Sequence, residues 1–485
     1  VNGVICRGRY MTADKQYVLM PILILYRILK KYKGVRFVKV TKYTTNDSGV
    51  MRAEPVFTAG SECGAAQHII IDKTPSNVCK GFGVALTGAS CYELARMEPA
   101  ARKKLLTDIY GKDGLNLSVA RLAIGSCDYS AEIYTYDDVP GDIELKHFSI
   151  ERDRAYILPM IKEILEIRPD LKFFASPWSP PGWMKTGGFI CGGYMRTKYI
   201  DVFADYIIKY LEAYEKEGIH ISALTPQNEP DVDQYGKFPA CIWNPDQEAK
   251  YIFTLSDKLK AKGMDVDIWF HDHNFNGWRR VNWMLEEYPK LTECCSSAAF
   301  HYYNGCIEMI DRIKEEHPEI RFQFTEGGPR LKDCFADDWC KWGTMMAKAL
   351  NHGCETFTGW NLMLDEEGRP NVGHCYCAGL VTLNSVTEEL SYSGQYRAFN
   401  HFAHFIQNGA EIYRSRVAND GWEVFDFRNM QFETTSCAAK NPDGSLVVQV
   451  INPNSEKRQC QIFYDNSWWY FDVMENSVST VVFSK

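Results

Sequence analysis

The sequence predicts an α/β protein, a (β/α)8 TIM barrel accompanied by a β-sandwich that both ends of the chain build. Three observations lead to this fold class. Eight short apolar segments alternate with helical patterns between residues 81 and 360, strand patterns occupy both flanks, and polar or aromatic side chains follow most of the eight segments. Alternation of this kind is typical of parallel sheets, because a helix returns the chain to the start of the next strand.

The eight strand candidates are short, apolar runs separated by turn residues. They are 81–86, 117–124, 172–176, 221–225, 267–270, 297–301, 321–325 and 354–359. Amphipathic stretches lie between them, such as 201–217, where Phe203, Tyr206 and Tyr210 recur at helical spacing. Eight strands that alternate with helices predict a closed barrel rather than an open sheet.

The two flanks predict a second domain. Strand patterns at 36–43 and 67–72 precede the barrel, and after a helix at 395–406 three more follow, at 445–452, 458–464 and 479–483. We therefore expect residues 35–77 and 405–485 to form the β-sandwich and 78–404 to form the barrel. Residues 1–34 are expected to be an N-terminal extension, rich in basic residues, whose role the sequence leaves open.

Composition limits the possible partners and compartment. The chain has 485 residues, 45% hydrophobic, with a net charge of −8, so nothing in its charge points to nucleic acid or an anionic membrane as the main partner. The 17 cysteines show no regular spacing of a disulfide framework, and the apolar run near residue 20 is too short to span a bilayer and lacks a cleavage site. A cytoplasmic protein is the favoured expectation, with secretion left open.

Polar and aromatic residues end most of the predicted barrel strands, and the ends of such strands carry the chemistry in this fold. They are Ser126-Cys127-Asp128, Trp178, Asn228-Glu229, His271-Asp272-His273, His301-Tyr302-Tyr303, Glu326 and Trp360-Asn361. Each residue alone would be an ordinary surface group. Together they predict one site at the carboxyl-terminal rim of the barrel.

Glu229 and Glu326 are the predicted catalytic pair, because they end the fourth and seventh strands and can face each other across the barrel axis. Two carboxylates about 5 Å apart can protonate a leaving oxygen and attack an anomeric carbon, with retention of configuration. Glu229, stiffened between Pro226 and Pro230, would be the acid, and we expect the negative neighbour to raise its pKa. We expect Asp272 to belong to a hydrogen-bonding wall rather than to a metal site, and we expect no cofactor.

The ordered motifs resemble those of glycoside hydrolase family 30 over residues 78 to 485. They are "GFGVALTGAS", "RLAIGSCDYS", "YTYDDVPGD", "ASPWSPPGWMKTGG", "TPQNEP", "FTEGG" and "GWNLMLDEEGRPNVG". The resemblance implies a (β/α)8 barrel with a β-sandwich and retaining hydrolysis of β-glycosides. It also implies that Glu229 is the acid/base, that Glu326 is the nucleophile and that Asn228 holds the sugar 2-hydroxyl.

The same resemblance implies further substrate-binding residues. Arg121 would steady the surroundings of the nucleophile, and His301 and Tyr303 would lie beside the carboxylates. Asp128 and Trp178 would bind the outer hydroxyls of a terminal glucose, with Trp360 and Asn371 on one wall of the pocket. The chain departs from the family pattern at Tyr302, Gly88 and Gly328, and at the segment 231–245, whose Trp243 is expected at the entrance.

These features predict a retaining exo-β-glycosidase that hydrolyses terminal β-glucosides, either glucosylceramide-like or short. A β-1,6-glucanase, or a β-xylosidase or β-fucosidase with the same chemistry, is the alternative. From another class, a carbohydrate-binding protein without activity would be expected to have lost one carboxylate, and both are present. The expected partner is a carbohydrate or glycolipid substrate, with no nucleic acid and no obligatory membrane; the oligomeric state stays open.

Overall fold

The computed structural model describes residues 38–59, 61–64, 66–333, 335–418 and 433–484, and Val40–Ser484 form one compact unit. The predicted extension at 1–34 lies outside the described residues. No described helix is both long enough and apolar enough to cross a membrane.

The centre of the fold is a closed barrel of eight parallel strands, in the order β10-β11-β12-β13-β6-β7-β8-β9. In chain order these are β6 (Gly81–Ala85), β7 (Val119–Ile124), β8 (Lys172–Pro177), β9 (Ile221–Leu224), β10 (Asp267–Asn274), β11 (Ser297–His301), β12 (Arg321–Glu326) and β13 (Cys354–Gly359). Each coincides with a predicted strand, so the barrel is confirmed. Helices cover the outside, so both faces of each strand are buried and the strands read as continuous apolar runs.

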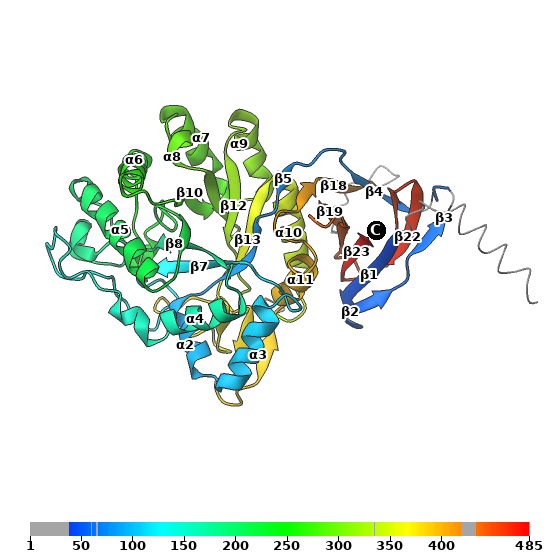
Figure 1. Cartoon of the computed structure of the whole chain (residues 1–485), viewed down its shortest axis with the longest axis horizontal. Helices are drawn as coiled ribbons and strands as arrows, with labels where there is room; N and C mark the ends of the chain where they lie inside the picture. Colours follow the sequence, from blue (N-terminus) through cyan, green and yellow to red (C-terminus); the bar gives the residue numbers. More distant parts are fainter. Residues whose placement is uncertain (1–37, 60, 65, 334, 419–432, 485) are drawn as a thin grey trace, which may run out of the picture. The chain divides into compact units, whose positions relative to one another are not determined.

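The helices lie around the strands, as Figure 1 shows. They are α2 (Gly88–Arg96), α3 (Pro99–Tyr110), α4 (Ile157–Ile167), α5 (Ile200–Lys216), α6 (Pro245–Lys262), α7 (Trp278–Glu287), α8 (Leu291–Cys294), α9 (Ile310–Glu316), α10 (Trp339–His352) and α11 (Gly394–Phe402). Capping contacts mark where the helices begin and end, as α6 illustrates. Helix α6 begins where the Asn244 side chain accepts from the Gln247 N–H, and it ends at Gly263, whose φ of 64° places it in the left-handed region.

Short 3₁₀ turns occupy several loops between these elements. They are η1 (Glu151–Ala155), η2 (Gly182–Met184), η3 (Thr186–Gly188), η4 (Thr197–Tyr199), η5 (Gln234–Gly236), η6 (Phe275–Gly277) and η7 (Ile307–Met309). Most lie in loops that follow the carboxyl ends of barrel strands, where the predicted site residues are.

Two further sheets form the sandwich, and both flanks of the barrel contribute to each, as predicted. The larger has the order β2-β1-β23-β20-β19-β17-β5 and the smaller β18-β4-β21-β22-β3. Their strands are β1 (Lys39–Asn46), β2 (Gly49–Glu54), β3 (Phe57–Ala59), β4 (Gln67–Ile71), β5 (Asn77–Val78), β17 (Glu411–Tyr413), β18 (Ser415–Ala418), β19 (Thr435–Lys440), β20 (Leu446–Asn452), β21 (Arg458–Tyr464), β22 (Ser467–Val473) and β23 (Ser477–Ser484).

Several strands lay outside the prediction. Strand β22 contains the run Trp468-Trp469-Tyr470 and pairs with β21 along its whole length. A small three-stranded sheet, β14 (Met363–Leu364), β15 (Val381–Leu383) and β16 (Leu390–Tyr392), forms within the segment after β13. Strands β14, β15 and β16 have only two or three residues each, too few for a hydrophobic pattern, so tertiary pairing decides them.

Candidate active site

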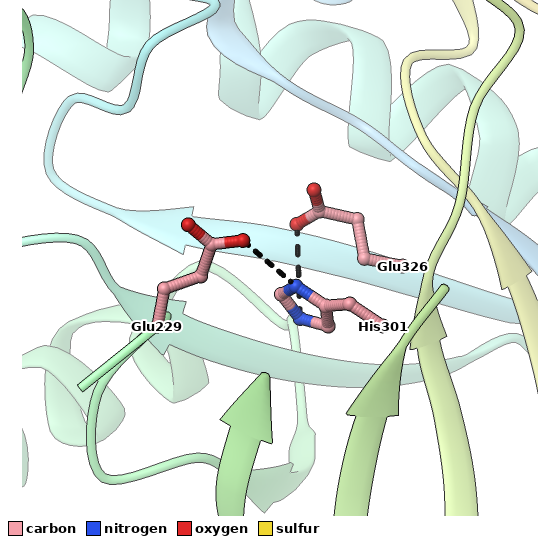
Figure 2. A group of neighbouring side chains, drawn as sticks. All are labelled: Glu229, His301 and Glu326. Carbon is pink, nitrogen blue, oxygen red and sulfur yellow. Dashed lines mark hydrogen bonds and ion pairs between the residues drawn. The ribbon is translucent and has the colours of Figure 1, made fainter. Parts of the chain in front are cut away.

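Three barrel strands bring the central residues of the site together, as Figure 2 shows. Glu326 is the last residue of β12, His301 is the last residue of β11, and Glu229 follows β9. One ligand-type atom from each of these side chains lies within 4.8 Å of those of the other two. The predicted carboxylate pair therefore meets on one rim of the barrel, with an imidazole between its members.

The backbone at Glu229 is held in an unusual conformation. Its φ is 50°, in the left-handed region that residues other than glycine rarely adopt. Its N–H donates to the Asp272 carbonyl at 3.1 Å, and the Asn228 N–H donates to the Pro177 carbonyl at 2.8 Å. These contacts tie the turn to strands β10 and β8, so the surrounding barrel stabilises a conformation that alone would be strained.

Arg121 on β7 links the acidic groups beneath the pocket. Its Nη1 donates to Glu326 Oε2, and its Nη2 donates to Asn228 Oδ1 and Asp272 Oδ2, both at 2.8 Å. Its guanidinium carbon lies 4.8 Å from the centre of the Trp178 ring. The side chain is fully buried, so its charge acts on the nearby carboxylates in a medium that screens little.

Asp272 lies at an irregularity in β10, where the pairing register with β11 shifts and His271 and Asp272 have φ values of 75° and 45°. This bulge turns the Asp272 carboxylate into the barrel. There Oδ2 accepts hydrogen bonds from Ser176 and Thr225, and Oδ1 accepts one from Thr325. Burial would raise the pKa of Asp272, but Arg121, His301 and the hydrogen bond from Thr225 hold it well below its usual range.

His301 contacts three carboxylates. Its Nδ1 lies 3.2 Å from Glu229 Oε1, and its Nε2 lies 3.1 Å from Asp272 Oδ1 and 3.9 Å from Glu326 Oε2. Burial alone would lower the pKa of His301, but the charge on Glu326 and the bonds to Asp272 and Glu229 raise it to about 9. His301 is therefore positively charged at neutral pH, and both ring nitrogens donate.

The pKa of Glu229 differs from the expectation. Burial raises it, as does any negative neighbour, but His273 and His301 lower it more, and the net direction is downward. His273 Nε2 lies 3.4 Å from Glu229 Oε1, and the Gln234 amide donates to Oε2. The sequence analysis placed His301 beside the carboxylates and His273 on the same rim, but it considered only the negative neighbour of Glu229 and so predicted the wrong direction for this pKa.

A cavity of about 170 Å³ opens over these groups. It is lined by Asp128, Trp178, Asn228, Glu229, Gln234, Phe238, Tyr303, Glu326, Trp360, Cys375 and Cys377. Trp178 and Trp360 are stacked, with ring centres 5.3 Å apart. Asp128 Oδ1 is buried without a partner among the described residues, and burial, together with Glu326 and Glu229, raises the pKa of this side chain well above its usual range. A buried acceptor without a partner is suited to a ligand hydroxyl.

Two residues lie elsewhere than expected. Asn371 does not line the cavity. Its Nδ2 donates to the Gly368 carbonyl at 2.9 Å and its Oδ1 accepts from the Cys375 N–H at 3.2 Å, so it shapes the loop that carries Cys375. Trp243 is not at an entrance either: it is 1% exposed and packs on Tyr251 in the core.

The group Glu229, His301 and Glu326 also has the spacing of a possible cation site. Its electrostatics oppose that use, because the positive charges of Arg121 and His301 already lie against both carboxylates. A cation would have to displace the imidazole proton, whose pKa is about 9. The charges around the two carboxylates therefore disfavour a bound cation.

A model of the glycosyl hydrolase family 30 TIM-barrel domain matches residues 79–406, which carry all eight barrel strands and every residue of the candidate site. The chain belongs to glycosyl hydrolase family 30. It is therefore a glycoside hydrolase, and the resemblance read from the motifs is confirmed.

Relatives of this family 30 chain have two kinds of name. Putative glucosylceramidase 4 of Caenorhabditis elegans is 26% identical, over 92% of this chain and 89% of the relative. Lysosomal acid glucosylceramidase of Mus musculus is 28% identical, over 78% and 75%. Endo-1,6-beta-D-glucanase of Neurospora crassa is 29% identical, over 79% and 81%.

Two solved structures are similar to most of this chain. SrfJ from Salmonella typhimurium has a TM-score of 0.84 at 25% identity and covers 92% of this chain and 100% of its own. The endo-beta1,6-glucanase BT3312 has a TM-score of 0.81 at 27% identity, covering 92% and 99%.

The sequence reasoning missed four residues that line the cavity of this family 30 enzyme. Gln234 and Phe238 come from the segment that departs from the family pattern, and Cys375 and Cys377 come from the segment after β13. The positive φ of Gln234, 52°, leaves no signal in the sequence. Nothing local to these residues marks them, because the loops that carry them follow different barrel strands.

Proposed function

We propose that this family 30 glycosidase is a retaining exo-β-glucosidase, which removes a terminal β-linked glucose by double displacement. The observation that carries the proposal is the carboxylate geometry: oxygens of Glu229 and Glu326 lie within 4.8 Å of each other. Retaining glycosidases hold the two carboxyl groups about 5–5.5 Å apart, whereas inverting enzymes leave room for a water between them.

In the first step the Glu326 carboxylate attacks the anomeric carbon and forms a covalent ester, while Glu229 protonates the departing oxygen. In the second step Glu229, now a carboxylate, takes a proton from water, whose oxygen attacks the same carbon and releases Glu326. The proton that Glu229 donates has a near source in His301, whose Nδ1 lies 3.2 Å from Oε1. Arg121 stabilises Glu326 as an anion in both its resting and leaving states.

The preference for a terminal glucose rests on the size of the cavity and on two of the side chains that line it. Asp128 offers an unpartnered acceptor to the outer hydroxyls, and the Trp178 ring offers an apolar face to the sugar. Cys375 and Cys377 line the same cavity, which is small, at about 170 Å³. A cavity of this size supports one sugar ring rather than a chain that passes through it.

An endo-acting β-1,6-glucanase is the second candidate. Two relatives with that activity in their names match this chain as well as the glucosylceramidases do, at 29% and 27% identity. The products separate the two candidates, because an exo enzyme releases glucose from the first turnover, whereas an endo enzyme first releases oligosaccharides. A β-xylosidase or β-fucosidase would differ at the hydroxyls that Asp128 is proposed to hold.

The test is hydrolysis of a panel of 4-nitrophenyl β-glycosides by the wild type, Glu229→Ala and Glu326→Ala. We expect glucoside turnover by the wild type and a loss of about 10²-fold or more in each variant. Azide then separates the two roles. With Glu229→Ala it should attack the glycosyl-enzyme and give the β-azide, and with Glu326→Ala it should take the place of the missing nucleophile and give the α-azide. Activity confined to another glycoside, or inverted product from the wild type, would overturn the proposal.

A further inference from the structure

A second cavity adjoins the sugar pocket at Glu229. Its volume is about 380 Å³, and it shares Glu229, Gln234 and Tyr303 with the pocket already described. Because Glu229 is proposed to protonate the departing oxygen, the leaving group must lie against this carboxylate, outside the space that the terminal sugar fills. The second cavity, here called the leaving-group groove, is the space that meets this condition.

The chemistry of the groove is polar throughout its described lining. It is formed by Glu229, Asp231, Val232, Gln234, His273, Asn274, Asn276, Tyr303 and Asn304. Among these residues Val232 alone lacks a side-chain group that can form a hydrogen bond. Asp231 is bonded to His273 Nδ1, and that ion pair, against the effect of burial, lowers the pKa of Asp231. A negatively charged carboxylate therefore lies in the groove at neutral pH.

Two side-chain amides in the groove are available to a ligand, and hydrogen bonds hold the backbone that carries them. Asn276 and Asn304 are exposed, and their side chains have no hydrogen-bond partner in the described part of the chain. Their backbones are tied together: the Asn276 N–H donates to the Asn304 carbonyl at 3.3 Å, and the Asn304 N–H donates to Asn274 Oδ1 at 3.1 Å. The loops after β10 and β11 thus present two amides from a connected backbone, which lowers the entropic cost of using them.

We propose that the leaving-group groove binds a hydroxylated leaving group, a second sugar unit, rather than a lipid chain. The inference rests on the proposed function and adds the substrate class of the departing half. A side-chain amide can donate to one sugar hydroxyl and accept from its neighbour. An alkyl chain in the same place would cover the amides and the Asp231 carboxylate without replacing their bonds to water, which is unfavourable.

The experiment compares substrates that share a terminal β-glucose and differ only in the leaving group. They are β-linked glucose disaccharides, octyl β-glucoside and 4-nitrophenyl β-glucoside, whose activated leaving group makes it the reference for the sugar pocket. We expect a disaccharide to have a higher kcat/KM than octyl β-glucoside. In the double variant Asn276→Ala/Asn304→Ala, the ratio of kcat/KM for the disaccharide to that for the nitrophenyl glucoside should fall about tenfold, as expected for the loss of two hydrogen bonds.

Gln459→Ala is the matched control, because it removes an exposed amide from β21 of the sandwich. It should leave the ratio unchanged. The proposal is overturned if octyl β-glucoside or detergent-dispersed glucosylceramide has the higher kcat/KM, or if the double variant keeps the wild-type ratio.

A binding measurement separates this proposal from the function on which it rests. If no glucoside is hydrolysed, the proposed function fails, and the groove is then tested by calorimetric titration of Glu229→Gln with the same disaccharide and with octyl β-glucoside. Tighter binding of the disaccharide, weakened about tenfold by the two asparagine substitutions, supports the groove assignment. Equal or tighter binding of octyl β-glucoside, or no effect of the substitutions, overturns it.

Discussion

At the scale of single residues, the site depends on which charges surround each carboxylate. Glu326 meets Arg121, whereas Glu229 meets two imidazoles and the Gln234 amide. A negative neighbour alone would raise the pKa of Glu229, yet the imidazoles lower it. The resting site therefore holds a positively charged imidazole, that of His301, beside the Glu229 carboxylate.

Arg121 provides the first prediction at this scale. Arg121→Lys keeps a positive charge but cannot reach Glu326, Asn228 and Asp272 together, because an ammonium lacks the planar fork of a guanidinium. We expect kcat for an aryl β-glucoside to fall about 10²-fold or more. Steady-state kinetics check it, with Arg416→Lys, an exposed arginine of β18, as the control. If Arg121→Lys had the wild-type kcat, the guanidinium and its hydrogen bonds would not have the role given to them here.

At the scale of elements, the site depends on strand ends that touch. Gly328 follows β12, and a Cβ at this position would lie 2.9 Å from the Cβ of Trp360, which follows β13. The glycine departs from the family pattern, and the structure supplies the reason: it allows the two loops to approach and seats the Trp360 ring against Trp178.

Gly328→Ala should therefore displace Trp360 and disturb the sugar pocket. The added methyl group would meet the Cβ and the backbone oxygen of Trp360, which cannot move unless the loop moves. We therefore expect kcat/KM for the glucoside to fall at least about tenfold and the free energy of unfolding to fall by about 1–3 kcal/mol. Kinetics and thermal unfolding measure both. Gly64→Ala is the control, since nothing lies within 4 Å of the position that its added methyl group would occupy and its φ is ordinary. Equal behaviour of the two variants would show that the close approach has no consequence.

A buried lysine, Lys185, joins two loops on the rim of the barrel. Lys185 Nζ donates to Ser179 Oγ, the Ile190 carbonyl and the Ala240 carbonyl, at 2.7, 2.6 and 2.7 Å. These bonds connect the loop after β8 with the segment that carries Gln234 and Phe238. Burial lowers the pKa of Lys185 to about 8. Below that pH the buried lysine is charged, and its burial then reduces the free energy of unfolding.

At the scale of the whole molecule, the buried charge network makes stability depend on pH. The pKa of His301 is raised from 6.5 to about 9. A group whose pKa is higher in the folded than in the unfolded protein stabilises the folded state. This contribution is complete at pH values below the pKa of the unfolded state, and it is lost as the pH rises through the pKa of the folded state. The contribution of His301 is therefore present at pH 6 and lost by about pH 9 to 10.

The prediction is that the difference in free energy of unfolding between the wild type and His301→Gln shrinks between pH 6.5 and 9.5, by about 3 kcal/mol. The comparison with the variant is needed because Lys185 has the opposite effect: its lowered pKa makes the free energy of unfolding rise above pH 8. Lys185 is present in both proteins, so its effect cancels in the difference. Urea unfolding at several pH values measures it. A difference that stays constant or grows with pH would contradict a charged His301.

The sequence by itself determined the architecture and the two carboxylates. Hydrophobic periodicity is a local property, so eight apolar runs with helices between them sufficed for the barrel, and the motif around Glu229 together with its strand-end position sufficed for the pair. Only the tertiary structure decided the rest. His273 next to Glu229, Gln234 on its other oxygen, and Asn276 with Asn304 in the groove come from the end of β10 and from the loops after β9, β10 and β11. Which of these loops meet, and therefore which charges set each pKa, depends on closure of the barrel, and no single stretch of sequence contains that information.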